Sequence, residues 1–205
     1  MLDLSGIKTI IFDLGGVVVN LDLNLSVEAF RRLGIRKPEQ FIQHGVHSDV
    51  FLKLEIGEIT EDEFYSGVKE LAGEELSNED IRAAWCAMFT TLPDERVRII
   101  ERLKKSYRVL LLSNTNSIHR SHFDGMAEGY QSLEELFDKV YYSFQLHDHK
   151  PNLSIFEKVI AEENIKPEEA LFVDDAQKNI AAARKTGMHT MLITPDKQME
   201  DIFKR

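Results

Sequence analysis

The stretch from Ile10 to Asn20, "IIFDLGGVVVN", decides the fold. An apolar run ends in one carboxylate, Asp13, and the chain then passes through Gly15 and Gly16 into a second apolar run. Apolar residues without polar alternation are typical of a strand that is covered on both faces of a parallel sheet. The sequence therefore predicts a buried strand that carries Asp13 to the edge of a sheet.

Similar apolar runs recur along the chain, and segments with helical periodicity separate most of them. The further predicted strands are "RVLLLSN" at 108–114, "ALFVDD" at 170–175, "HTMLI" at 189–193 and the weaker "KVYYSF" at 139–144. The predicted helices are "DERVRIIERLKKS" at 94–106, "SIFEKVIAEENI" at 154–165 and "QKNIAAARKTG" at 177–187. Alternating strands and helices predict an α/β fold with a doubly wound, mostly parallel sheet.

The stretch from about Leu23 to Thr91 interrupts this pattern. It contains no convincing strand but several helical segments, one of which begins at Thr60 with the spacing of a capping box. We therefore predict an inserted α-helical cap domain of residues 21–91 and an α/β core domain of residues 1–20 and 92–205.

Composition excludes several classes of protein. The formal net charge is −10, and Lys and Arg never cluster beyond a pair, which argues against a nucleic-acid partner. No run of about 18 apolar residues exists, so we expect no membrane span. One cysteine, Cys86, cannot form an internal disulfide, and no signal peptide is visible. These features predict a cytoplasmic protein, and they leave a monomer and a homodimer both open.

Three of the predicted strands carry polar residues at their carboxyl ends. These residues are Asp13, Ser113, Asn114, Asp174 and Asp175. Ligands of open parallel sheets bind beyond the carboxyl ends of the strands, so we expect these side chains to converge on one rim. Lys150, in the segment "HDHKPNLSIF", is expected to join them.

Carboxylates that share a small volume repel one another, and a divalent cation relieves that repulsion. Mg²⁺ prefers oxygen ligands and combines one or two carboxylates with phosphate and water. The predicted ligands are Asp13, Asp175, the carbonyl of Gly15 and, directly or through water, Asp174. Together with Lys150 the metal would create a small cationic spot on an acidic protein. Such a spot suits a compact dianion such as a phosphate monoester.

A carboxylate beside a bound metal is also a candidate nucleophile. Attack of Asp13 on phosphorus would give an aspartyl-phosphate, which water then hydrolyses. Phosphoryl transfer needs mainly positioning and charge neutralisation, and this set of residues can provide both. We expect Ser113 Oγ and the backbone N–H groups of Gly15 and Gly16 to bind the non-bridging phosphate oxygens.

The segments "FDLGGVVV", "LLLSNTN", "HKPNLSIF" and "LFVDDAQKNI", in this order and spacing, resemble the four motifs of the haloacid dehalogenase-like (HAD) hydrolases. The motifs span about residues 7 to 193, and the helical insert resembles the cap of the subfamily with an α-helical cap. The resemblance is strongest to the bacterial branch that contains sugar-phosphate phosphatases, among them α-glucose-1-phosphate phosphatase. It extends to the phosphatase domain fused to soluble epoxide hydrolases.

The resemblance implies a Rossmann-like core and a role for each motif residue. It implies that Asp13 is the nucleophile and that Ser113 binds phosphate, with Asn114 orienting its loop. It also implies that Lys150 neutralises charge on Asp13 and on the phosphoryl group. The two remaining acids, Asp174 and Asp175, would then hold Mg²⁺.

One position departs from the family pattern. Phosphatases of this family usually carry a second Asp two residues after the nucleophile, and this acid protonates the leaving group and later activates water. The chain has Gly15 there. The enzyme is therefore slow, acts on a good leaving group such as an anomeric phosphate, or uses another group. Candidates for that group are Asn20, Asp22 and a residue of the cap.

The leading hypothesis is a Mg²⁺-dependent phosphatase of a small phosphate monoester, with a sugar phosphate favoured. A second hypothesis is a metal-independent 2-haloacid dehalogenase, because those enzymes also lack the second Asp. Against it stands the Asp174–Asp175 pair, which a metal-free site would leave uncompensated. A third hypothesis, supported only by Gly15, is a catalytically impaired binding or regulatory module.

Overall fold

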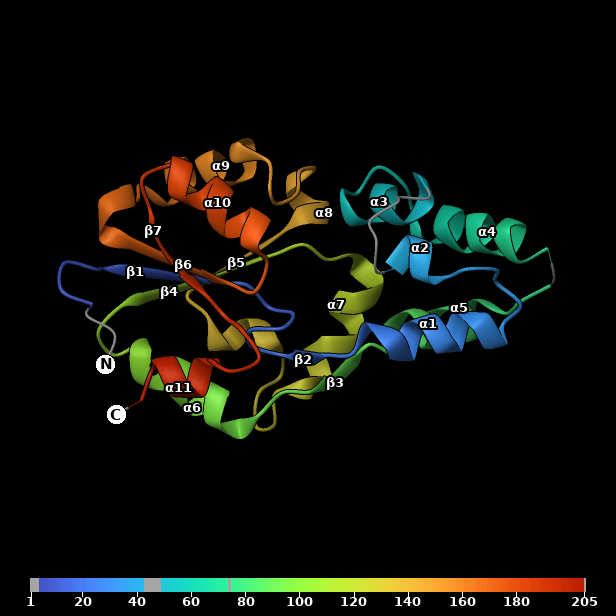
Figure 1. Cartoon of the computed structure of the whole chain (residues 1–205), viewed down its shortest axis with the longest axis horizontal. Helices are drawn as coiled ribbons and strands as arrows, with labels where there is room; N and C mark the ends of the chain where they lie inside the picture. The colour runs from blue at the N-terminus through green and yellow to red at the C-terminus, as the bar shows by residue number, and fades with distance from the viewer. Residues whose placement is uncertain (1–3, 43–48, 74, 205) are drawn as a thin grey trace.

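A five-stranded parallel sheet in the order β5-β4-β1-β6-β7 forms the centre of the core (Figure 1). This computed structural model describes residues 4–42, 49–73 and 75–204. The strands are β1 (Thr9–Phe12), β4 (Arg108–Ser113), β5 (Lys139–Tyr142), β6 (Ala170–Asp174) and β7 (His189–Leu192). All five predicted strands are present, and the predicted fold class is confirmed.

Helices cover both faces of this sheet (Figure 1). They are α6 (Asp94–Leu103) with α11 (Met199–Ile202) on one face, and α9 (Leu153–Glu163) with α10 (Gln177–Lys185) on the other. Ile10 and Phe12 of β1 belong to the apolar cluster of the first face, whereas Ile11 belongs to that of the second. Because both faces are buried, the successive residues from Ile10 to Phe12 are all apolar, which explains the missing alternation.

The helical segment of residues 23–86 packs around a third apolar cluster. Its helices are α1 (Leu23–Arg32), α2 (Glu39–Ile42), α3 (Asp49–Glu55), α4 (Glu61–Ala72) and α5 (Asn78–Cys86). Edge-to-face ring contacts of Phe51 with Phe30, Phe64 and Trp85 hold the cluster together. Thr60 caps α4 through the predicted capping box with Glu63. This cluster meets the core at Ile118, and Phe89 packs against both this cluster and a cluster of the sheet.

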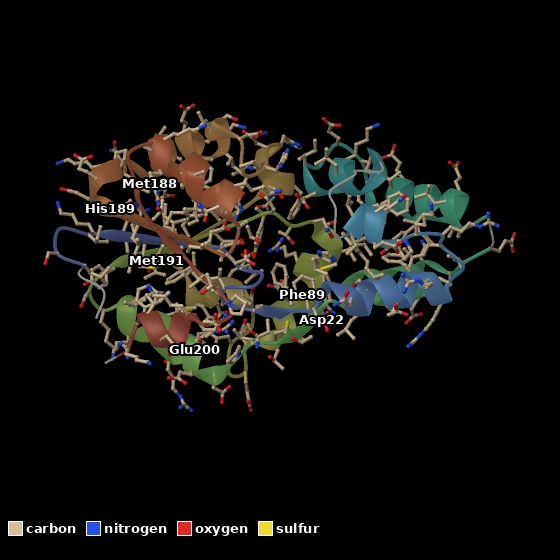
Figure 2. All side chains as sticks on the ribbon, viewed as in Figure 1. Asp22, Phe89, Met188, His189, Met191 and Glu200 are labelled. Atoms are coloured by element: carbon tan, nitrogen blue, oxygen red, sulfur yellow. The ribbon has the colours of Figure 1, made fainter. Side chains whose placement is uncertain are left out.

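Two short strands link the helical segment to the sheet. β2 (Asn20–Leu21) and β3 (Phe89–Thr91) pair antiparallel, and Figure 2 labels Asp22 and Phe89 at this ribbon. The expectation of no strand between Leu23 and Thr91 is therefore wrong at β3. Three residues are too few to show a period, and their partner lies far away in the sequence. We propose that this ribbon is the boundary between the core of residues 1–20 and 92–205 and the cap of residues 21–91.

The remaining helices of the core are short. They are α7 (Ser117–Phe123), which follows β4, and α8 (Ser143–Leu146), which follows β5. None of the helices formed by residues 4–42, 49–73 and 75–204 has both the length and the apolar character needed to cross a bilayer.

Candidate active site

Asp13 lies directly after β1, at the carboxyl edge of the sheet. The backbone N–H of Asp13 donates to Val173 O at 2.9 Å. The Leu14 N–H donates to Asp13 Oδ1 at 2.7 Å. Burial raises the pKa of Asp13 to about 7, Lys150 opposes the shift, and the neighbouring acids Asp174 and Asp175 add to it. Asp13 is thus a carboxyl group whose charge the protein alone does not fully compensate.

Lys150 is the cation that joins the acids. Its Nζ lies 2.8 Å from Asp13 Oδ1 and 2.8 Å from Asp174 Oδ2, and the side chain is 1% exposed. Burial alone would lower the pKa of Lys150, but Asp13 and Asp174 together hold it above its usual value. Asp174 is held in turn by the Ala176 N–H at 2.7 Å and by Asn179 Nδ2 at 3.1 Å from each oxygen. Asp174 therefore positions Lys150. Both carboxylate oxygens of Asp174 already accept hydrogen bonds from these groups.

Asn114 connects the β4 rim to the lysine. Its Nδ2 donates to Lys150 O at 2.9 Å, and its Oδ1 accepts from the Lys150 N–H at 2.9 Å. Ser113, the last residue of β4, is buried at the same rim, and among the described residues its Oγ has a single long contact, 3.5 Å to Asn114 O. The predicted orienting role of Asn114 thus acts on the backbone of Lys150, and the Ser113 hydroxyl remains available for a ligand.

The two glycines after Asp13 differ in what they can do. Gly16 has a φ of 73°, and a Cβ there would lie 2.3 Å from Asp175 Oδ2, so only glycine fits. Its N–H donates to Val19 O at 2.8 Å. The binding of phosphate by the Gly16 amide stays a prediction, and this hydrogen bond within the loop weighs against it. Among the described residues no backbone group pairs with the N–H or the carbonyl of Gly15.

Three acids converge where a cation was predicted. Oxygen atoms of Asp13, Asp174 and Asp175 all lie within 4.8 Å of one another. The pKa of Asp175 is raised by burial and by Asp174, and Lys150 opposes this shift. The excess of carboxylates over cations and the all-oxygen donor set fit Mg²⁺. Since the oxygens of Asp174 are engaged, Asp13, Asp175 and the Gly15 carbonyl are the groups free to hold it.

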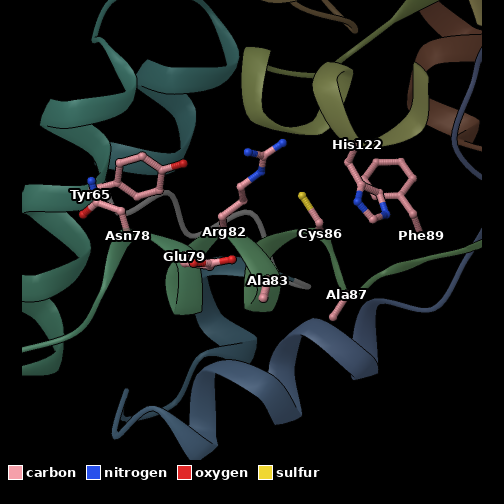
Figure 3. Close-up of a pocket in the computed structure, with 9 residues that line it drawn as sticks. All are labelled: Tyr65, Asn78, Glu79, Arg82, Ala83, Cys86, Ala87, Phe89 and His122. Carbon is pink, nitrogen blue, oxygen red and sulfur yellow. The ribbon is translucent and has the colours of Figure 1, made fainter. Parts of the chain in front are cut away.

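A cleft at the cap lies away from these acids. It has a volume of about 720 Å³ and is lined by Tyr65, Arg82, Cys86, Phe89 and His122 among others, as Figure 3 shows. None of the predicted site residues lines it. Burial raises the pKa of Cys86 to about 11, so this thiol is not a nucleophile at neutral pH. The convergent acids, and not this cleft, are the candidate active site.

Two residues at the rim had no specific signal in the sequence. Asn179 belongs to the motif "LFVDDAQKNI", but only the fold shows that it holds Asp174. Glu55 ends cap helix α3, and its carboxyl group interacts electrostatically with Lys150. A contact between the cap and the rim joins residues that are far apart in the sequence, so no short motif indicates it. The sequence alone could therefore name only an unspecified cap residue as the replacement acid.

Comparison with known proteins agrees with this geometry. A family model described as haloacid dehalogenase-like hydrolase matches residues 7–187. The chain is 36% identical over 187 residues to D-ribitol-5-phosphate phosphatase of Bacteroides thetaiotaomicron, covering 90% of each chain.

Solved structures of similar proteins superpose on nearly the whole chain. A HAD family enzyme of Bacteroides thetaiotaomicron superposes with a TM-score of 0.90 at 33% identity, covering 98% of this chain and all of the other. The wild-type form of that enzyme in complex with magnesium and inorganic phosphate gives a TM-score of 0.87 at 32% identity, covering 97% of this chain and 100% of the other. The likeness therefore extends over the cap as well as the core.

Proposed function

The chain belongs to the haloacid dehalogenase-like hydrolases, and we propose that it is a Mg²⁺-dependent phosphatase of a small sugar phosphate or sugar-alcohol phosphate. One observation carries this proposal. Lys150 bridges Asp13 and Asp174 at 2.8 Å each, while Asp175 completes a cluster of acids that one cation can neutralise. The relative that hydrolyses D-ribitol 5-phosphate supports a small phosphorylated polyol or sugar as the substrate class.

Each residue of the rim has a part in this reaction. Lys150 fixes Asp13 Oδ1, so the other carboxylate oxygen of Asp13 attacks phosphorus. Ser113 Oγ and the Gly15 N–H bind non-bridging oxygens, and Asn114 holds the backbone of Lys150. Asp13, Asp175 and the Gly15 carbonyl would hold Mg²⁺, which would supply positive charge to the phosphoryl group. Water then hydrolyses the aspartyl-phosphate and regenerates the Asp13 carboxylate.

Chelation of the metal is expected to abolish turnover. Without Mg²⁺ the acids around Asp13 repel a phosphate dianion, and Lys150 alone cannot offset them. We expect EDTA to lower phosphate release from a panel of sugar phosphates by about 10²-fold or more, and excess Mg²⁺ to restore it. Released inorganic phosphate is measured in each condition.

The same assay separates the alternative functions. Halide release from a 2-haloacid that persists in EDTA would favour the metal-independent dehalogenase. Stabilisation by inorganic phosphate and Mg²⁺ without turnover of any ester would favour a binding module.

Magnesium affinity is expected to fall as the pH falls. The pKa of Asp13 is raised to about 7, so below that pH the metal must displace a proton from the carboxyl group, whereas above it the carboxylate is already present. The apparent Kd for Mg²⁺ should increase up to about tenfold per pH unit below pH 7 and level off above it. Titration calorimetry between about pH 5.5 and pH 8.5 measures this dependence. A Kd that is constant across this range would contradict the assignment of Asp13 as a ligand.

A further inference from the structure

The loop after β1 has no space for an acidic side chain at position 15, and its polar side chains at positions 20 and 22 are hydrogen-bonded. A Cβ at Gly15 would lie 2.5 Å from Leu21 Cδ1, so an apolar side chain fills the place of the missing acid. Asn20 Nδ2 donates to Thr91 Oγ1 at 2.9 Å within the ribbon. Asp22 Oδ1 accepts from the Asn24 N–H at 3.0 Å and caps α1. The two candidates nearby in the sequence, Asn20 and Asp22, thus have structural roles. A residue of the cap helices is left as the candidate acid.

Cap helix α3 lies beside α8 of the core at this rim, as Figure 1 shows. Its last residue is Glu55, whose carbonyl accepts a 2.7 Å hydrogen bond from Ser143 Oγ, and the same Oγ accepts from the Thr115 N–H at 2.8 Å. The next carbonyl, of Ile56, lies 3.1 Å from His147 Nδ1. These contacts fix the end of α3 between the Ser113 loop and the Lys150 loop.

The Glu55 carboxyl group lies within electrostatic range of cations of the core. Burial raises the pKa of Glu55, and the charges of His149, Lys150 and Lys178 oppose this shift. Lys150 contacts Asp13 Oδ1 at 2.8 Å, so the same lysine that pairs with the nucleophile also interacts with Glu55. Glu55 is partly buried at the junction of cap and core, and none of the described residues donates a hydrogen bond to its carboxyl group. Within residues 4–42, 49–73 and 75–204, no hydrogen bond ties this acid into the packing.

We propose that Glu55 is the catalytic acid and base that replaces the acid missing at position 15, an inference that rests on the proposed phosphatase function. As Asp13 attacks phosphorus, the bond to the leaving oxygen breaks, and the Glu55 carboxyl group gives its proton to that oxygen. The resulting Glu55 carboxylate then takes a proton from the water that attacks the aspartyl-phosphate. The bond between phosphorus and Asp13 breaks, and both carboxyl groups return to their starting states.

The test compares wild type, Glu55→Gln and, as a matched control, Glu58→Gln, which makes the same change at an exposed residue three positions on. Two substrates are assayed with Mg²⁺: glycerol phosphate, whose alkoxide is a strong base, and p-nitrophenyl phosphate, whose phenolate needs no proton. Glu55→Gln should lower kcat/KM for glycerol phosphate by about 10²–10⁴-fold and change it little for p-nitrophenyl phosphate. Because hydrolysis of the intermediate then lacks its base, p-nitrophenol should appear in a burst equal to the enzyme concentration.

The outcomes are distinct. Equal loss of kcat/KM for both substrates, or no loss for either, would overturn the role of Glu55, since a structural or binding role does not depend on the leaving group. The Glu58→Gln control should match wild type. A wild-type protein that hydrolyses neither ester in Mg²⁺ would instead overturn the proposed phosphatase function.

Discussion

Asp13→Asn is expected to abolish phosphate release, with a loss of roughly 10⁴-fold or more in kcat. The amide nitrogen and oxygen that replace the carboxylate cannot attack phosphorus to form the aspartyl-phosphate. The neutral side chain also removes one negative ligand of the metal. The substitution preserves shape, so the sheet that carries Asp13 should fold unchanged and the circular dichroism spectrum should match that of wild type.

Asp22→Asn is the matched control for this variant. Asp22 follows the short strand β2 and caps α1, at the ribbon shown in Figure 2, and it takes no part in the acid cluster. We expect Asp22→Asn to keep most of the activity at a small cost in stability. Acid quenching with radiolabelled substrate gives a second readout, because wild type should trap a hydroxylamine-sensitive phosphoenzyme and Asp13→Asn should trap none. An Asp13→Asn protein that retains a tenth of the activity would assign the nucleophile elsewhere.

The strands and most of the rim could be predicted because their signals are local. The apolar run of β1 is followed directly by Asp13, and the apolar run of β6 ends in Asp174. The apolar run of β4 ends in a polar residue, Ser113. A parallel sheet places all carboxyl ends of its strands at one edge. Local sequence and one topological rule therefore suffice to bring together residues that are about 160 positions apart.

The connections between the motifs could not be predicted, because they depend on how loops meet. The pairing of Asn114 with the backbone of Lys150 requires both loops at once. The Gly16 N–H donates to the carbonyl of Val19, three residues further on, in a tight turn whose hydrogen bonds the composition does not show. The site of Glu55 depends on the docking of α3 against α8, which follows from packing of the whole cap and not from any short motif.

Lys150→Met is expected to remove activity and to destabilise the protein strongly. The lysine is 1% exposed and bridges Asp13 and Asp174, so its loss leaves buried carboxylates without their cation. Breaking a buried ion pair on one side typically costs about 3–5 kcal/mol in the free energy of unfolding. Turnover should fall by about 10³-fold, because one of the two charges that neutralise the phosphoryl group and hold Asp13 is gone.

The loss of stability should depend on pH, and this dependence separates charge from packing. The pKa of Asp13 is already raised to about 7, and removal of Lys150 raises it further, because Lys150 is the group that lowers it. An acid whose pKa is raised by folding loses stability as the pH rises from its unfolded value through its folded value. Lys150→Met should therefore be much less stable than wild type at about pH 8 and closer to it at about pH 5.5.

Denaturant unfolding at the two pH values, with and without Mg²⁺, measures this effect. Mg²⁺ should stabilise Lys150→Met more than wild type at the higher pH, because the metal then supplies the only compensating charge in the cluster. Lys8→Met is the control: Lys8 contacts Glu169 at 2.8 Å on an exposed surface, where an ion pair contributes little to stability. If Lys150→Met were no less stable than Lys8→Met at either pH, the buried bridge between Asp13 and Asp174 would not be what holds the acids together.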